Sequence, residues 1–244
     1  MDRLIYTVLS GMRARAAAQA VTANNLANAG TSGFRRELSS LASRYVAGPE
    51  ATARVQAGNA VQTALLDPGT AEATGQPLDV AIDGAGWIAV QATDGSEAYT
   101  RRGDLRVSAA GLLQTGDGHP VIGSSGGPIA VPPALSVAVA GDGTVSIVTE
   151  ASPLPVVLDR IKLVDPPPST LARGDDTLFR TPAPADAAPA VRVTGGMLER
   201  ANVSTPAELV DLLEGSRAFE ANVRLLGQAR DMDEAGVKLM RYDG

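Results

Sequence analysis

The chain has 244 residues, of which 44% are hydrophobic and only 3% aromatic, and its formal net charge is −6. This length is sufficient for one or two domains with aliphatic cores, and the acidic balance argues against nucleic acid as a partner. The chain has no cysteine, which excludes disulfide bonds, thiolate metal sites and a cysteine nucleophile.

The first expected element is a helix over about residues 2–29. Its seam positions recur at alternating steps of four and three residues, which is the heptad spacing of a helix that packs against other helices. We expect the helix to end near 28–30, where Gly30 would provide a left-handed cap. The seam positions that we expect to contact other helices are Ile5, Leu9, Met12, Ala16, Gln19, Ala23 and Leu26.

Residues 31–75 follow as an extended connector without a strong pattern. A short helix near 35–46 fits this part of the sequence, and the basic pair Arg35 and Arg36 is expected on a solvated face. A connector of this length is unusual inside a compact domain. It suggests a segment that becomes ordered in an assembly.

Residues 76–200 are expected to form a central all-β domain. Leu78, Val80 and Ile82 alternate with polar or small residues, and residues 87–91 form a short apolar run. Turn signals follow at short intervals, whereas residues 166–168 and 182–189 are rich in proline and should be loops or extended segments. The turns are expected at Asp83-Gly84, Asp94-Gly95, Ala110-Gly111, Asp117-Gly118 and Asp142-Gly143.

Residues 201–244 form the last expected element, a second long helix. Thr205 fits the N-cap, Pro206 the first helical position and Glu208 the third. The predicted fold is therefore α+β, with helices at 1–30 and 201–244 forming a coiled-coil-like inner domain. The seam positions of the second helix are Leu209, Leu212, Ser216, Phe219, Val223 and Leu226.

The two ends of the chain have opposite charge. Residues 1–44 carry six arginines against two acids, and residues 199–244 carry nine acids against six bases. The seam of the first helix is also rich in alanine, so each contact buries little apolar area. Such a helix needs contacts on several sides, which favours a crowded helical assembly over a monomer.

No arrangement of residues indicates catalysis or a cofactor. His119, the only histidine, lies in a predicted turn, and the sequence has no nucleophile elbow for a hydrolase. Gly84-x-Gly86 precedes a strand rather than a helix, which argues against a dinucleotide site. A glycosidase would need a paired acid of raised pKa, and Glu97 and Glu150 show no partner in the sequence. We therefore expect a non-enzymatic protein without cofactor or metal.

Three stretches together resemble a known family. NNLANAGTSGFRR (24–36) and RANVSTPAELVDLLEGSRAFEANVRLL (200–226) resemble the two terminal signatures of bacterial flagellar rod and hook axial proteins. DGAGWIAVQATDGSEAYTRRGDLRVSAAGLLQTGDGHPVIG (83–123) is similar to the β-domain motif of the same family. The stretches occur in the family's order and span both ends of the chain.

The resemblance implies a structural subunit of the rod, most similar to proximal-rod members. Its terminal helices would form an inner coiled-coil layer lining a hollow, torque-transmitting shaft, and the β domain would lie outside it. Asn28 would end the inner helix, Asn24 and Asn25 would bond to backbone groups or to a neighbouring subunit, and Phe34 would anchor the exit. A distal-rod subunit, or a secreted filament or adhesin protein from outside the flagellum, is the alternative.

The family also implies partners and a location. The partners would be like subunits, other rod proteins of the proximal and distal rod, and the flagellar type III export apparatus. The location would be the periplasmic rod of the basal body. The first residues show no apolar core of a cleaved signal peptide, and no apolar run approaches the roughly 20 residues of a membrane span. We therefore expect export without a cleaved signal, and no membrane insertion.

Overall fold

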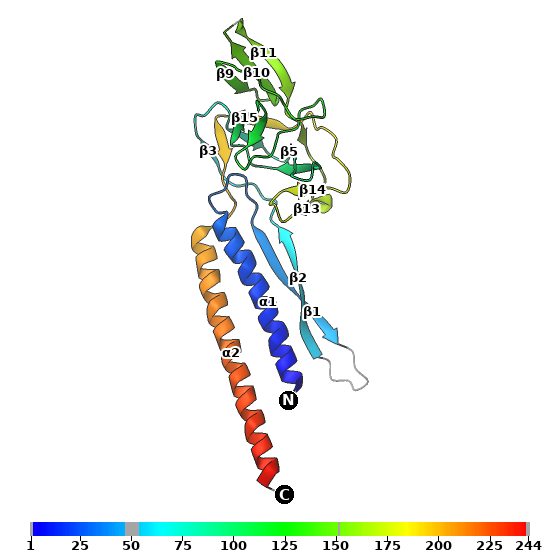
Figure 1. The fold of residues 1–244 in the computed structure, drawn as a ribbon, viewed down its shortest axis with the longest axis vertical. Coiled ribbons are helices and arrows are strands. Elements are labelled where there is room, and N and C mark those ends of the chain that lie inside the picture. Colours follow the sequence, from blue (N-terminus) through cyan, green and yellow to red (C-terminus); the bar gives the residue numbers. More distant parts are fainter. Residues whose placement is uncertain (1, 47–53, 151, 243–244) are drawn as a thin grey trace. The chain divides into compact units, whose positions relative to one another are not determined.

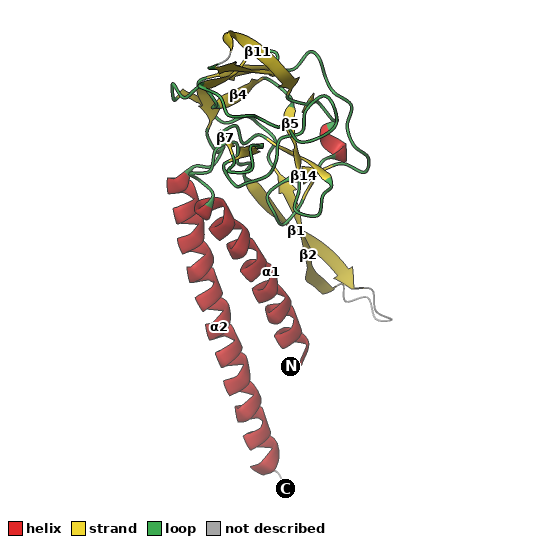
Figure 2. Cartoon of the chain, turned by 45° about the horizontal axis from the view of Figure 1, so that its top comes forward, coloured by secondary structure: helices red, strands yellow, loops and turns green. Residues whose placement is uncertain are grey.

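The computed structural model describes residues 2–46, 54–150 and 152–242. In this part of the chain the fold is α+β, with two long helices and many short strands (Figure 2). The chain divides into two compact units. Unit 1 comprises Met1–Ala27, Glu37–Leu65 and Ser204–Gly244, and unit 2 comprises Asn28–Arg36 and Leu66–Val203.

Unit 1 contains the two long helices, α1 (Asp2–Ala27) and α2 (Thr205–Tyr242). They lie side by side and run in opposite directions (Figure 1), so the end of α1 lies beside the start of α2. Among the side chains of α1 that the structure describes (residues 8–27), the buried ones are Ala14, Val21 and Asn25, which recur at helical spacing on one face. Small side chains on this face allow the helix to approach its neighbours closely.

A β-hairpin completes unit 1. Its strands β1 (Glu37–Val46) and β2 (Arg54–Ala64) are antiparallel, with Glu37 opposite Ala64 and an irregularity after Leu41. Both strands lie beside α1. The short helix that the sequence suggests near residues 35–46 is therefore wrong. Helix propensity is a weak preference, and here pairing with a strand further along the chain overrides it.

Unit 2 confirms the predicted β structure in the middle of the chain. The five predicted Gly turns are present, and their glycines all have positive φ. Residues 182–189 lie in a loop that includes a single bridge at Ala187. The elements of unit 2 are β3 (Ala71–Ala73), β4 (Val80–Asp83), β5 (Trp87–Gln91), β6 (Glu97–Thr100), β7 (Leu105–Val107), β8 (Leu113–Thr115), β9 (Ser136–Val139), β10 (Thr144–Thr149), β11 (Ser152–Arg160), β12 (Leu163–Val164), the 3₁₀ turn η1 (Pro168–Thr170), β13 (Ala172–Arg173), β14 (Phe179–Arg180), β15 (Arg192–Gly195) and β16 (Met197–Glu199).

The strands of unit 2 form several small sheets. The largest has the order β12-β5-β6-β14-β13, and a three-stranded sheet has the order β11-β10-β9. The remaining strands pair as β15-β4, β16-β3 and β7-β8. The core between them is aliphatic, as the composition predicts, and includes Val80, Ile88, Leu113 and Ile161. Trp87 and Phe179 pack together with their ring centroids 4.6 Å apart.

The predicted helix ends are correct to within a few residues, but two caps differ. α1 ends at Ala27, yet Gly30 does not have positive φ; the left-handed residue is Gly33, at φ +67°. A Cβ at Gly33 would lie 2.2 Å from the carbonyl oxygen of Arg101, so only glycine fits. For α2, the Glu208 N–H donates to the Ser204 carbonyl at 3.0 Å, which makes Ser204 the N-cap and Thr205 the first helical residue.

Candidate functional site

The predicted seam of α1 does not coincide with the face that the chain itself buries. Leu9, Ala16 and Ala23 are exposed, and Met12, Gln19 and Leu26 are partly exposed. Ile5 lies on α1, but its side chain lies outside the described residues. Ala14 and Val21 each lie two residues from the nearest seam positions, or about 160–200° around the helix. Most of the seam therefore faces away from the residues of α1 that are buried within unit 1, although Gln19 borders the space between the two helices.

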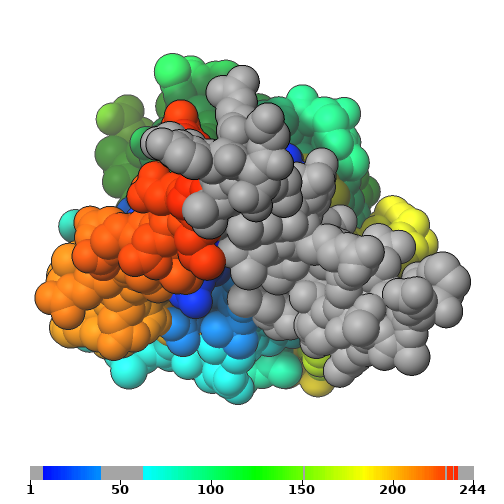
Figure 3. Space-filling view, turned by 90° about the horizontal axis from the view of Figure 1, so that it is seen from below, coloured from blue at the N-terminus to red at the C-terminus, as the bar shows by residue number. Residues whose placement is uncertain are grey.

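The predicted seam of α2 is divided between contact and exposure. Leu212, Ser216, Phe219 and Leu226 are partly buried, whereas Leu209 and Val223 are 45% and 48% exposed. Viewed from below, the orange and red atoms of α2 form an open surface on one side of unit 1 (Figure 3). Among the side chains of α2 that the structure describes, the large apolar ones that are exposed are Leu209, Val210, Leu213, Val223, Leu225 and Met232.

A groove of about 350 Å³ lies between the two helices. Its lining consists mainly of residues with small side chains, and one charged residue from each helix, Arg15 and Asp211, borders it. The small side chains on both helices leave this space unfilled. The lining residues are Gly11, Ala14, Arg15, Ala18, Gln19, Thr22, Asp211 and Gly215.

Asn25 is the predicted site residue whose surroundings are best defined. Its Nδ2 donates to the Glu37 carbonyl at 2.9 Å, and its Oδ1 accepts from the Glu37 N–H at 2.8 Å. Nδ2 also lies 3.5 Å from the Glu208 carboxylate at the start of α2. Asn25 is 1% exposed, and Glu208 is fully buried. Asn25 thus bonds to backbone groups, which is one of the two alternatives expected from the sequence, and its role in assembly stays a prediction.

The neighbouring predicted residues have local partners. Asn24 Nδ2 lies 3.4 Å from the Glu37 carboxylate. Asn28 accepts from the Thr31 N–H at 2.9 Å through its carbonyl, which closes the turn after α1. Phe34 is 5% exposed, and the guanidinium carbon of Arg173 lies 4.6 Å from its ring centroid. Phe34 is thus fixed within unit 2, whereas Asn24 and Asn25 bond within unit 1.

The sequence prediction for Arg35 is wrong. This arginine was expected on a solvated face, but it is 1% exposed and forms an ion pair with Glu199. Arg101 forms a second ion pair with Glu199, at 2.9 Å, and is 6% exposed. Glu199 lies 164 residues from Arg35 and 98 residues from Arg101 in the sequence, so no local sequence pattern predicts the cluster. One sequence feature could have pointed to the cluster: Arg35, Arg101 and Glu199 all lie within or beside the three stretches that resemble the family.

The pKa values in this cluster follow from burial and charge. Burial by itself would raise the pKa of the Glu199 carboxyl, but the hydrogen bonds and charges of Arg35 and Arg101 bring it below its usual value. Burial lowers the pKa of the Arg35 guanidinium, although its bond to Glu199 acts in the opposite direction. An arginine nevertheless stays protonated in proteins, so the cluster carries two positive charges and one negative charge at neutral pH.

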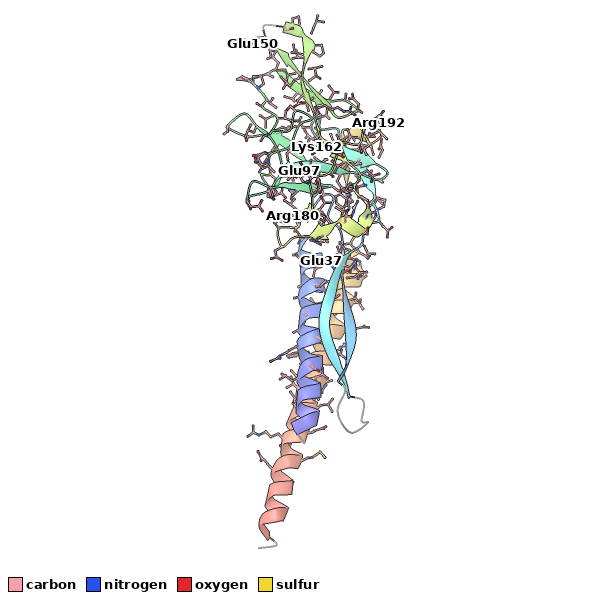
Figure 4. The ribbon with its side chains drawn as sticks, turned by 90° about the vertical axis from the view of Figure 1, so that its right-hand side faces the viewer. Glu37, Glu97, Glu150, Lys162, Arg180 and Arg192 are labelled. Carbon is pink, nitrogen blue, oxygen red and sulfur yellow. The ribbon has the colours of Figure 1, made fainter. Side chains whose placement is uncertain are left out.

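Other charged groups of unit 2 have structural partners. Glu97, for which the sequence showed no partner, forms an ion pair with Lys162 at 2.8 Å, and both side chains are 16% exposed (Figure 4). No three His, Cys, Asp or Glu side chains in the described part of the chain lie close enough together to hold a metal ion. Among the residues described, neither helix has an apolar stretch long enough to cross a membrane.

Three segments of the chain match described protein families. Residues 5–35 match the family described as "Flagella basal body rod protein", and residues 81–147 match "Flagellar hook protein FlgE/F/G D1 domain". Residues 194–239 match "Flagellar basal body rod FlgEFG protein C-terminal". The α+β fold and the order of these segments define the class as rod and hook proteins of the bacterial flagellum.

Relatives that align over most of the chain indicate which member of this class it resembles most. The chain is 40% identical to the flagellar basal-body rod protein FlgF of Escherichia coli, with 95% of each chain covered. It is 39% identical to FlgF of Salmonella typhimurium over 93% of each chain, and 31% identical to FlgG of Bacillus subtilis over 99% of this chain and 100% of the relative. The chain belongs to the flagellar basal-body rod protein family, and these FlgF relatives are more similar to it than the FlgG relative.

Proposed function

We propose that this chain is a structural subunit of the proximal part of the flagellar rod, which polymerises helically through its terminal helices into a hollow, torque-transmitting shaft. Its higher identity to the FlgF relatives than to the FlgG relative supports the proximal over the distal assignment. Its role is mechanical rather than enzymatic. Its partners are further copies of the same subunit, the other rod proteins and the flagellar export apparatus. Its location is the periplasmic rod.

The observation that carries this proposal is that α1 has two faces suited to packing. One face, with Ala14, Val21 and Asn25, is buried within unit 1. The other is the heptad seam, which includes Leu9 and Leu26 and stays partly or fully exposed. A helix with two packing faces needs neighbours on both faces, and the seam of α1 stays partly or fully exposed although α2 and the β1–β2 hairpin both contact this helix.

The exposed surface of α2 supports the same conclusion. Leu213 and Met232 are 61% and 62% exposed, which is unusual for large apolar side chains repeated along one helix. The opposite charges of the two chain ends would favour contacts between α1 of one copy and α2 of another. We propose that residues 1–30 and 201–244 form the inner coiled-coil-like domain, that 31–75 connect it, and that 76–200 form the central β domain.

The proposed interface residues are those that the heptad spacing predicts, together with the asparagines and Phe34 of the first family stretch. Leu26 gives a direct test, because it lies on the exposed seam at a partly exposed position. Leu26→Asp places a charge where neighbouring helices would pack, and desolvating that charge is costly. Unit 2 does not contain Leu26, so its fold should be unaffected.

The experiment uses a strain from which the native gene is deleted and which is complemented with the wild-type or a variant chain. Leu26→Asp should abolish swimming and leave no complete rod in isolated basal bodies. Ala110→Asp, which makes the same change of charge at an exposed turn of unit 2, should swim like the wild type. Complete basal bodies in the uncomplemented deletion strain would overturn the proposed function, and normal rods from Leu26→Asp would overturn the proposed interface.

A further inference from the structure

The chain passes between the two units four times, and the segments of unit 2 that flank these crossings lie together. Residues 28–36, 66–70 and 199–203 are joined by backbone and side-chain hydrogen bonds. All of the segments that link unit 2 covalently to the helices and the hairpin therefore meet in one place within unit 2. These bonds are Gly33 N–H to Glu199 O (2.7 Å), Asn202 N–H to Phe34 O (3.2 Å), Arg200 N–H to Thr70 O (2.8 Å), Arg36 N–H to Asn202 Oδ1 (2.6 Å) and Asn202 Nδ2 to Asp67 O (2.8 Å).

Glu199 is at the centre of this meeting point. Its carboxylate accepts from Arg35 in the first segment, from the Gly69 N–H in the second at 2.8 Å, and from Arg101 in the β core at 2.9 Å. The Glu199 side chain is 4% exposed, and that of Arg35 is fully buried. One carboxylate thus binds all three segments and attaches them to the β core of unit 2.

Trp87, at the start of β5, completes the cluster. The guanidinium carbons of Arg35 and Arg101 lie 5.9 Å and 5.7 Å from its ring centroid, within the range of a cation–π interaction. Arg35 Nε and Nη2 and Arg101 Nε are buried without a hydrogen-bond acceptor. The indole face is the electron-rich group available to these two cations. We refer to Arg35, Arg101, Glu199 and Trp87 as the arginine joint.

Stability alone does not explain a cluster of this kind. Replacing buried ion pairs by well-packed apolar residues is often neutral or stabilising, whereas removing one partner is strongly destabilising. Hydrogen bonds between charged groups are directional. The planar guanidinium and the carboxylate therefore fix the position of each segment relative to the others. The arginine joint should therefore resist displacement of the crossing segments more than an apolar contact would.

We propose that the arginine joint is the element of unit 2 that transmits force between the four chain crossings and the β core. The physiological part of this proposal rests on the proposed function, since a rotating rod is what would apply the force. The mechanical part does not, because force applied to the two chain ends reaches unit 2 through residues 28–36 and 199–203, whichever assembly the chain forms.

Single-molecule pulling on the full-length chain by its two ends tests the mechanical part. Arg35→Lys keeps the charge but loses the planar guanidinium that binds Glu199 through Nη1 and lies near the Trp87 ring, and it should lower the force at which unit 2 unfolds. Glu97→Gln breaks an ion pair of unit 2 away from the crossings and is the matched control; it should leave that force unchanged. Equal forces for Arg35→Lys and the wild type, or an equal loss in both variants, would overturn the proposal.

Swimming in media of rising viscosity tests the physiological part. Cells with Arg35→Lys should swim like the wild type in dilute medium and lose speed in viscous medium, where load on the rod is higher. Cells with Glu97→Gln should follow the wild type throughout. If Arg35→Lys prevents rod assembly, Trp87→Phe, which keeps an aromatic face of weaker cation–π strength, replaces it. A variant that weakens the pulled chain but swims normally at every viscosity would show that the joint bears no physiological load.

Discussion

Asn25 on α1 and Glu37 at the start of β1 are joined by two hydrogen bonds in opposite directions, at 2.9 Å and 2.8 Å. The side-chain amide of Asn25 uses its donor and its acceptor as a neighbouring strand would use a peptide group. The Glu208 carboxylate, 3.5 Å from the same Nδ2, brings α2 to this point. One buried side chain therefore links both helices and the hairpin of unit 1.

Asn25→Ala should loosen unit 1 without unfolding unit 2. The change leaves the N–H and carbonyl of Glu37 without their side-chain partner, at a cost of about 1–3 kcal/mol. We expect a lower urea midpoint for the loss of helix signal in circular dichroism, and impaired rod assembly in cells. Ala20→Ser, at an exposed position of the same helix, should change neither. An unchanged helix midpoint in Asn25→Ala would contradict the role of this network.

Gly33 and Gly30 should respond differently to the same substitution. Gly33→Ala puts a Cβ 2.2 Å from the Arg101 carbonyl oxygen and holds a left-handed conformation that costs alanine about 1–2 kcal/mol. Gly30 has no atom within 4 Å of such a Cβ, so Gly30→Ala should be neutral or slightly stabilising. Trp87, the only tryptophan, lies in unit 2 and reports its unfolding by fluorescence in urea. Equal midpoints for the two variants would show that the turn does not require glycine at 33.

Most of the helices and turns that could be predicted from this sequence were indicated by the hydrophobic periodicity and by the residues typical of turns. The heptad spacing around Leu9 and Met12 and the capping residues near Ser204 depend on neighbours within a few residues, so both helices were found. The Asp-Gly turns of the β region depend on the φ of one glycine each, and they were also found. The exposed heptad face of α1 stays a prediction, because we propose that its partners lie in other subunits.

The remaining features depend on residues far apart in the sequence. Arg35 resembles any basic residue after a turn until Glu199 and Arg101 are placed beside it, and no periodicity links positions 35, 101 and 199. The β1–β2 hairpin was missed for a related reason. Its strands are rich in Ser, Ala and Gln, so the alternation that marks a half-buried strand is weak.

Leu213 on α2 allows the exposed helix surface to be tested apart from the fold. Leu213 is 61% exposed, so Leu213→Lys should change the stability of the isolated chain by no more than about 0.5 kcal/mol. In cells it should reduce rod assembly, because a lysine would enter a helix contact between subunits. Leu135→Lys, at a 66% exposed position of unit 2, makes the same change away from the helices and should swim normally. Equal swimming by both variants would argue that this part of α2 faces solvent in the rod.

Acid should weaken unit 2 through Glu199. Its pKa in the folded chain lies below the unfolded value of about 4.3, because Arg35 and Arg101 outweigh the effect of burial. A depressed pKa gives a stabilisation that is complete above the unfolded pKa and is lost as the pH falls through the folded one. The free energy of unfolding should therefore decrease below about pH 5, as the proton that Glu199 takes up leaves two buried arginines facing each other.

Glu199→Gln separates this contribution from those of other acids. Asp176, whose pKa is lowered mainly by its hydrogen bond from Arg180, remains in the variant, so some dependence of the stability on pH should persist. Asp67, whose charge acts on Arg35, also remains. The urea midpoint of unit 2, followed by Trp87 fluorescence, should fall less steeply with acid in Glu199→Gln than in the wild type. Parallel curves for the two chains would mean that the ion pairs of Glu199 do not set the acid stability of unit 2.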